Sequence, residues 1–316
     1  MNLKQITEKY NTQAKCLSFL AKERWGKAVT CSYCGSDRVI KAKNEEGRYH
    51  CYNCKRSFSV LVGTIFQDTK LSLPDWFWVI GLILTSPTGI SAMSISRKTG
   101  MSLKTSWLTA MKIRCAMIDK DTQLHGVLEM DESYFSAKDG KLPAGEPSKP
   151  VISNVTEKRG RGTKKVPVVG IVEKSGHVKT KIIEKLTTRN LMAMLNHSVN
   201  TEDSVLITDG FRSYNQMDEA IEHITVRHKD RKAGAANVNT IEGYWGLIKN
   251  GIRGNFKSLS KKYLPFYLVE YEYKYNRRKD TPKQLFDEFI HAALTDESCM
   301  LNNKPTKDTK EVVYGW

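Results

Sequence analysis

Hydrophobic positions follow two patterns along the chain, a helical one first and then one of short strands. Between residues 60 and 118 apolar residues recur at helical spacing, and residues 76–85 form the longest apolar run. From about Gly126 short apolar runs of strand length take over. We predict strands over 127–135, 166–173 and 177–183, a helix over 188–198, a strand ending at Asp209, a short strand at 224–228, a helix beginning near Asn239 and helical sequence over 259–294.

This order of strands and helices is that of the ribonuclease-H-like fold. In that fold, carboxylates on the first strand, just after the fourth strand and on a later helix converge at one edge of the sheet. Asp131, Asp209 and Glu242 occupy these three places and are the candidate catalytic residues. The expected fold class is a multi-domain α+β or α/β chain whose catalytic domain is ribonuclease-H-like.

Three clustered carboxylates suit phosphoryl transfer on a nucleic acid. Cleavage of a phosphodiester builds negative charge on the attacking and leaving oxygens, and two metal ions about 3.5–4 Å apart can stabilise both. Mg²⁺ prefers oxygen ligands and keeps several waters, so a few carboxylates suffice. Carboxylates held close together also repel one another without a cation. The three acids therefore predict a site for two Mg²⁺ or Mn²⁺ ions.

The two aspartates also have structural explanations. Asp131 has Glu129 and Glu132 as neighbours, and any of the three could be solvated at a sheet edge. Asp209 precedes Gly210, and an Asp-Gly pair after an apolar run is often only a turn. Neither aspartate alone identifies a site.

The stretch NTIEGYWGLIKNGIRGNF allows two roles for Glu242. Asn239 could be the N-cap of a helix, with Glu242 closing a capping box. Alternatively Glu242 is a metal ligand on a face that it shares with Lys249 and Arg253, which suit a phosphate backbone, although a salt-bridged surface would look the same. The adjacent face carries an apolar stripe that we expect to be buried: Ile241, Trp245, Ile248 and Ile252.

Charge narrows the class of partner. The 316 residues include 50 Lys and Arg against 34 Asp and Glu, a formal net charge of +16. This indicates a polyanionic partner, nucleic acid first and an acidic membrane surface second. The longest apolar run is too short to span a bilayer, and the N-terminal residues lack the apolar segment of a secretory signal. We expect a cytoplasmic protein associated with the nucleoid.

Four of the seven cysteines form two C-x2-C pairs separated by 16 residues, Cys31 with Cys34 and Cys51 with Cys54. This spacing is typical of a zinc ribbon, in which each pair presents two thiolates to one tetrahedral ion. Redox pairs or disulfides are the alternative, and disulfides fit poorly with the missing secretory signal. Because four ligands leave no open position, we predict one structural Zn²⁺.

Residues 86–118 have the pattern of a helix-turn-helix. Gly100 would form the turn, and Ser102 would cap a second helix whose Lys104 reaches into a major groove of DNA. The core face of the first helix would begin with three apolar residues: Ile90, Met93 and Ile95. An ordinary helical hairpin with a basic surface is the alternative.

Seven blocks, in order, carry a resemblance that covers roughly residues 15–290: FSVLVGTIFQDTKLSLPDWFWVI, GISAMSISRKTGMSLKTSW, MDESYF, VPVVGIVE, LITDGFRSYNQM, NVNTIEGYWGLIKNGIRGNF and LSKKYLPFYLVEYEYKYNRR. With the zinc ribbon before them, they make the sequence similar to the DDE transposases of bacterial insertion sequences, specifically the ISXO-like group related to the Merlin superfamily. The resemblance implies Mg²⁺-dependent cleavage at transposon ends and strand transfer into target DNA, by a homo-oligomer on double-stranded DNA.

The resemblance places the first two acids at Asp131 and Asp209. It places the last motif at Glu242, followed by the basic residue Lys249. Some members are described with Asn as the third ligand, so Asn239 is held in reserve. His228 stands where a histidine is common in the family, and it would contact DNA or the edge of the site; a packed or solvated histidine is the alternative.

The expected domains are a helical arm at 1–25, the zinc ribbon at 26–60, a helix-turn-helix-like region at 61–122, the catalytic domain at 123–294 and a tail at 295–316. A different class of function also fits this organisation: a non-catalytic, domesticated or decayed DNA-binding protein that uses the ribbon to read sequence. All three acids are present, which favours the enzyme.

Overall fold

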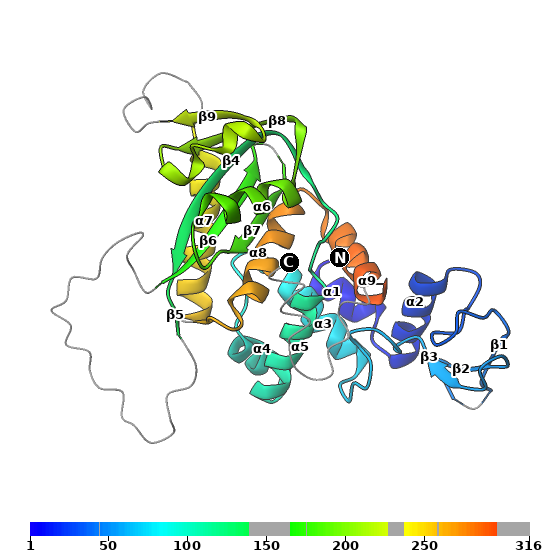
Figure 1. The fold of residues 1–316 in the computed structure, drawn as a ribbon. Helices are drawn as coiled ribbons and strands as arrows, with labels where there is room; N and C mark the ends of the chain where they lie inside the picture. The colour runs from blue at the N-terminus through cyan, green and yellow to red at the C-terminus, as the bar shows by residue number, and fades with distance from the viewer. Residues whose placement is uncertain (44, 139–164, 175, 227–236, 258, 296–316) are drawn as a thin grey trace. The chain divides into compact units, whose positions relative to one another are not determined.

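The computed structural model describes residues 1–43, 45–138, 165–174, 176–226, 237–257 and 259–295. The chain forms two compact units, one made of Met1–Ile118 with the residues from Arg277 onward, and one made of Asp119–Asn276. Each unit has its own core, and Figure 1 shows their elements. No helix in these ranges is both long and apolar enough to cross a membrane.

The N-terminal unit combines helices with a small three-stranded sheet. Its elements are α1 (Leu3–Lys9), α2 (Gln13–Trp25), β1 (Val39–Lys41), β2 (Arg48–Cys51), β3 (Ser57–Ser59), α3 (Leu73–Leu84), α4 (Ala92–Thr99), α5 (Leu103–Cys115) and α9 (Pro282–Thr295). The apolar run predicted from sequence forms most of α3, which is buried on nearly every side. Aromatic rings of Tyr10, Phe77 and Phe286 pack together and join α3 to α9.

Helices α4 and α5 confirm the two predicted helices and the turn between them. Gly100 ends α4 with φ of 75°, a left-handed conformation that favours glycine. The Ser102 hydroxyl then accepts a hydrogen bond from the Thr105 N–H and caps α5. Ile90 and Ile95 are buried, whereas the expectation for Met93 is wrong because its side chain is 47% exposed.

The second unit is built around a five-stranded sheet in the order β7-β6-β4-β8-β9. Its strands are β4 (Leu124–Phe135), β6 (Val166–Glu173), β7 (Val178–Ile182), β8 (Val199–Asp209) and β9 (Glu222–Val226). The first three pair antiparallel, and β4, β8 and β9 pair parallel. This is the ribonuclease-H-like topology, with the strands within a few residues of their predicted positions.

Helices cover both faces of this sheet (Figure 1). Helix α6 (Thr188–Ser198) packs on one face, where its Leu191 and Leu195 join Leu128 and Met130 of β4 in a buried core. Helices α7 (Asn239–Gly251) and α8 (Leu264–Asn276) belong to the other face. Alternation along β4 sends Leu128 and Met130 to α6 and leaves the residues between and after them for α7.

Shorter elements complete this unit. Two 3₁₀ turns, η1 (Arg212–Tyr214) and η2 (Met217–Glu219), follow β8, and a π-helical turn, η3 (Ile252–Phe256), continues α7. Short β5 (Ala137–Lys138) and β10 (Leu259–Ser260) pair parallel. The unit ends at Asn276, so α9, which we expected in the catalytic domain to residue 294, packs instead with α2 and α3. The sequence shows that one face of α9 is apolar, but it does not show which core that face covers.

Candidate active site

Asp131 and Asp209 lie side by side on neighbouring parallel strands. Met130 of β4 is in register with Thr208 of β8, so the next residue of each strand is an aspartate. Residues in register on adjacent strands project to the same face, and for this pair it is the face that α7 covers. The sheet thus brings together two of the three acids predicted from sequence.

The three acids of the segment EMDE have different surroundings. Glu129 is fully buried, and its carboxylate accepts hydrogen bonds from the Thr240 hydroxyl at 2.8 Å and the Ile241 N–H at 2.9 Å. Glu132 projects to the opposite face and accepts a hydrogen bond from the Tyr214 hydroxyl at 2.9 Å. Asp131 is half-buried and shares its face with Asp209, whereas Glu129 is bound to the start of α7 and Glu132 is bound to Tyr214 on the other face.

Burial and nearby negative charge raise the pKa of Asp131. Burial raises its pKa to about 7, and the charges of Glu132 and Asp209 act in the same direction. The Trp245 indole N–H donates to its Oδ2 at 3.1 Å, which favours the ionised form. A divalent cation between the aspartates would relieve this repulsion, so the donor set fits a hard, oxygen-liganded metal ion.

Asp209 has a turn role as well as its place beside Asp131. Its Oδ1 accepts a hydrogen bond from the Phe211 N–H at 3.1 Å, which shapes the turn after β8. The turn interpretation and the site interpretation are therefore compatible, because the carboxylate has a second oxygen.

The capping-box interpretation of Asn239 and Glu242 is wrong. Helix α7 begins at Asn239 itself, its N-cap position is Val238, and no side chain caps it from that position. Glu129 of β4 takes over this task by accepting the Ile241 N–H. A carboxylate is well placed there, because the first turn of a helix carries unsatisfied N–H groups and a partial positive charge.

Glu242 is exposed on α7, next to the side of the helix that faces Asp131. At about 100° per residue, Glu242 lies about 60° around the helix from Trp245, and Asn239 about 120° in the same direction. Glu242 is thus rotated less far than Asn239 from the side of α7 that contacts Asp131. The three acids do not form a tight cluster: in the described ranges, the four cysteines are the one set of three or more such ligands whose atoms all lie within 4.8 Å.

Cations line the same side of α7. The Lys249 side chain is exposed overall, but partial burial of its ammonium group lowers its pKa, while the negative charge of Asp131 opposes the shift. Lys165, just before β6, and Arg253 lower it further. Lys104 is exposed near the start of α5. His228 lies outside the described residues.

The four cysteines form a compact site in the N-terminal unit. The Sγ atoms of Cys31 and Cys54 are 3.7 Å apart, as are those of Cys34 and Cys51. A tetrahedral zinc ion with Zn–S bonds of about 2.3 Å requires sulfurs about 3.8 Å apart, so the spacing fits. The pKa of Cys34 is lowered to about 7, chiefly by a hydrogen bond from the Ser36 backbone, which favours the thiolate that binds metal.

Two family models match the chain. The ISXO2-like transposase domain matches residues 123–276, close to the second compact unit, and the transposase zinc-ribbon domain matches residues 11–57. The chain belongs to the ISXO2-like transposases.

Relatives of this transposase come from an archaeon and a bacterium. An uncharacterized protein in transposable element ISH50 of Halobacterium salinarum is 26% identical, with 90% of this chain and 97% of that protein covered. An uncharacterized transposase-like protein of Haemophilus influenzae is 28% identical, with 31% of this chain and 80% of that protein covered.

Solved structures with a distant likeness are complexes of the Mos1 transposase. A pre-cleavage Mos1 transpososome aligns with a TM-score of 0.27 at 12% identity over 74% of this chain and 76% of that one. The Mos1 strand transfer complex aligns with a TM-score of 0.28 at 11% identity over 70% and 75% of the two chains. The fold assignment rests on the strand order of the sheet and not on these alignments.

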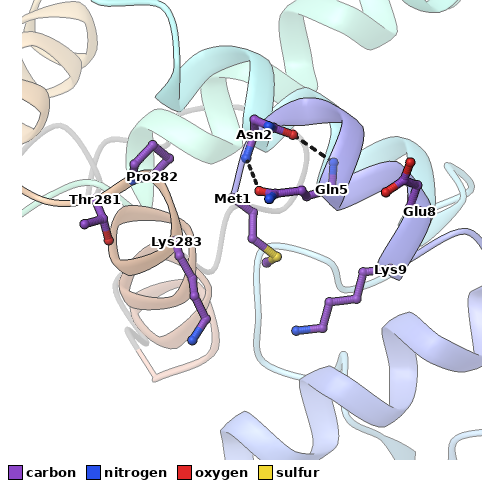
Figure 2. Close-up of a pocket in the computed structure, with 8 residues that line it drawn as sticks. All are labelled: Met1, Asn2, Gln5, Glu8, Lys9, Thr281, Pro282 and Lys283. Atoms are coloured by element: carbon purple, nitrogen blue, oxygen red, sulfur yellow. Dashed lines mark hydrogen bonds between the residues drawn. The ribbon is translucent and has the colours of Figure 1, made fainter.

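An open hollow of about 670 Å³ lies elsewhere in the transposase, in its N-terminal unit (Figure 2). Residues from α1 line it together with Thr281, Pro282 and Lys283 at the start of α9. Asn2 and Gln5 form a capping box there, with hydrogen bonds of 3.0 and 2.9 Å. None of the candidate catalytic acids contributes to it.

Sequence reasoning missed two functional neighbours in the transposase domain. Trp245 was expected only as part of a buried stripe, yet its N–H contacts Asp131. Glu129 was considered only as a rival of Asp131, yet it caps α7. The signal for Trp245 was present, since an indole on a helix face beside three predicted ligands needs a partner for its N–H when buried.

Proposed function

We propose that this protein is the transposase of an insertion sequence, which cleaves DNA at the ends of its element and joins them to target DNA. The observation that supports this most strongly is the in-register pair Asp131 and Asp209 on the face covered by α7, within a transposase domain. The reaction is phosphoryl transfer, first by hydrolysis and then by transesterification, on double-stranded DNA.

The aspartates would hold Mg²⁺ or Mn²⁺, with Glu242 as the third ligand and Asn239 in reserve. When bound, such ions stabilise the charge on the attacking and leaving oxygens of an in-line displacement. Asp131 must lose its proton to serve as a ligand, and the N–H of Trp245 favours that ionised form. The geometry of α7 supports Glu242, because it is rotated about 60° from Trp245, which contacts Asp131, whereas Asn239 is rotated about 120°.

Basic residues of both units would hold the DNA. Lys249 of α7 and Arg253 of η3 would contact phosphates beside the acids, and the two positive charges lie close enough to influence one another. The cap and turn of α4 and α5 support a helix-turn-helix in which Lys104, at the start of α5, contacts DNA. The ribbon would bind one structural Zn²⁺ and contribute to recognition of the ends. We expect the protein to work as an oligomer on the nucleoid in the cytoplasm.

The decisive experiment uses purified protein, Mg²⁺, a duplex carrying the inverted repeats that flank the gene, and a supercoiled target. We expect cleaved and joined products from the parent, and at least a thousandfold loss in Asp131→Asn and Asp209→Asn, with end binding retained. Equal products from parent and variants would refute the site. Binding of the ends without cleavage by the parent would establish the non-catalytic DNA-binding alternative.

The third ligand is decided in the same assay. Glu242→Gln and Asn239→Ala form a matched pair, since both side chains lie in the first turn of α7. We expect the Glu242 variant to lose strand transfer and the Asn239 variant to retain it. The opposite result would assign the third ligand to Asn239.

A further inference from the structure

Helix α7 is fixed to the sheet at two places, one on each side of Glu242. On the C-terminal side, the Trp245 indole N–H donates to Oδ2 of Asp131 at 3.1 Å. On the N-terminal side, Glu129 accepts from the Thr240 hydroxyl and the Ile241 N–H at 2.8 and 2.9 Å. Both anchoring carboxylates come from the same strand, β4.

The Trp245 contact depends on a notch in the sheet. Gly170 of β6 is in register with Asp131, and a Cβ placed on Gly170 would lie 2.8 Å from Cζ2 and 2.9 Å from Cη2 of Trp245. Such distances are too short for a real side chain, so the indole lies in the space that the glycine leaves open. Phe135 of β4 also packs edge-on against the ring, with ring centres 6.0 Å apart. These contacts hold the ring in the position from which its N–H reaches Asp131.

The Glu129 contact is buried. Glu129 has no exposed surface, and the Ile241 side chain beside it is also fully buried. Hydrogen bonds to a charged acceptor are stronger than neutral ones, and breaking them in a buried place leaves polar groups unpaired. This contact therefore fixes both the height and the rotation of the first turn of α7 relative to β4.

We propose that Trp245 and Glu129 are positioning residues, which set the geometry of the metal site by holding Asp131 and the turn of α7 that carries Glu242. The inference rests on the proposed function, because it gives these contacts a purpose at a metal site. Trp245 fixes the plane of the Asp131 carboxylate. Glu129 fixes the helix from which Glu242 or Asn239 extends, so it acts on the third ligand whichever of the two it is.

Metal affinity distinguishes this role from a purely structural one. Mn²⁺ binding to the zinc-loaded full-length protein is measured from the loss of the free Mn²⁺ electron paramagnetic resonance signal. Replacing the partners of metal ligands commonly weakens binding 10–100-fold, so we expect Trp245→Phe and Glu129→Leu to raise the Kd at least about tenfold. Glu129→Gln should stay within about threefold, because an amide can accept from the Ile241 N–H and donate to the Thr240 hydroxyl.

Trp76→Phe is the matched control. Trp76 is a buried tryptophan of the N-terminal unit whose N–H donates to Thr69 at 2.8 Å, so its replacement removes the same kind of bond away from the acids. We expect it to leave the Kd for Mn²⁺ unchanged. An equal loss of affinity in this control would mean that general destabilisation explains the effect, and would overturn the inference.

Asp209→Asn separates failure of the inference from failure of the proposed function. If the parent and Asp209→Asn bind Mn²⁺ equally, the metal site itself is wrong. If Asp209→Asn weakens binding while Trp245→Phe and Glu129→Leu bind as tightly as the parent, the site stands and the positioning role is wrong. A Glu129→Gln variant as weak as Glu129→Leu would also contradict the role assigned to these hydrogen bonds.

Discussion

Asn276 of helix α8 bonds both backbone groups of Val178 on the edge strand β7. Its Oδ1 accepts from the Val178 N–H at 2.8 Å, and its Nδ2 donates to the Val178 carbonyl at 3.1 Å. One turn earlier, Glu272 accepts from the Thr180 N–H at 2.8 Å. Side chains of α8 thus occupy backbone groups that an edge strand would otherwise offer to another chain. This gives a structural role to part of the sequence KYNRR.

Replacement of Asn276 should destabilise the second unit. Asn276→Ala leaves the two backbone groups of Val178 without their partners, so we expect a loss of about 1–3 kcal/mol in the free energy of unfolding and faster exchange of the Val178 amide. Urea unfolding and hydrogen exchange measure these effects. Asn250→Ala, at an exposed position of α7, is the control and should change stability by less than about 0.5 kcal/mol. An unchanged exchange rate of the Val178 amide would contradict this role of the Asn276 side chain.

Replacement of Gly170 should disturb the packing of α7. A Cβ at this position would meet the Trp245 ring at 2.8 Å and Ile241 Cδ1 at 3.0 Å, so Gly170→Ala should lower the free energy of unfolding by about 1–3 kcal/mol. Gly243→Ala is the control, because nothing lies within 4 Å of its added Cβ and alanine favours a helix. Thermal unfolding of both variants checks the prediction, and equal melting temperatures would contradict it.

The pKa of Asp131 predicts how stability depends on pH without divalent ions. Because burial raises this pKa from 3.8 to about 7, the folded state holds the proton more tightly than the unfolded state. The stabilisation is complete below about pH 4 and is lost as pH rises through 7. Asp131→Asn should therefore match the parent at pH 4 and exceed it at pH 8, by up to about 4 kcal/mol in the free energy of unfolding.

Denaturant unfolding of the zinc-loaded protein at both pH values, in a buffer that contains neither Mg²⁺ nor a chelator, tests this difference. Asp203→Asn, which removes an exposed carboxylate from β8, should show no such dependence. If the free energy of unfolding of Asp131→Asn relative to the parent is the same at pH 4 and pH 8, the pKa of Asp131 is not raised in the folded protein.

We expect zinc binding to depend on the four cysteines of the ribbon and not on the other cysteines of the chain. We expect one zinc ion per chain, and Cys51→Ser should lose it and unfold the ribbon, because a small three-stranded sheet has little core without the metal. Cys16→Ala is the control, since Cys16 is buried in α2 outside the cluster. Metal analysis of the two variants checks this, and a Cys51 variant that keeps its full zinc content would remove that residue from the site.

Local patterns in the sequence predicted the elements well, and contacts between distant segments account for what was missed. The strands and helices of the second unit lie close to their expected positions because apolar periodicity is a local property. Alternation along β4 turns Asp131 and Glu132 to opposite faces, a distinction that we did not draw from the sequence. It could not separate Asp131 from Glu129, since the two share a face, and only the helix partner 112 residues away distinguishes them.

The helix start at Asn239 shows the same limit. Its sequence contains a complete capping box, yet the structure satisfies the first turn with Glu129 from a strand. Tertiary context overrode a local signal because a buried carboxylate on β4 needed donors, and the free N–H groups of α7 supplied them. The pairing of α9 with α2 was equally beyond the sequence, since amphipathicity identifies a covered face but not its cover.

The in-register aspartates have a genetic consequence. Because successive residues of a strand alternate between faces, loss of one codon from β4 before Asp131 would turn this carboxylate toward α6 and bring Glu132 to its place. Under the proposed function, a three-base deletion that keeps the reading frame open would therefore abolish transposition as completely as a stop codon. A copy with this deletion would keep its zinc ribbon unchanged and, under the proposed function, would still compete for the same ends.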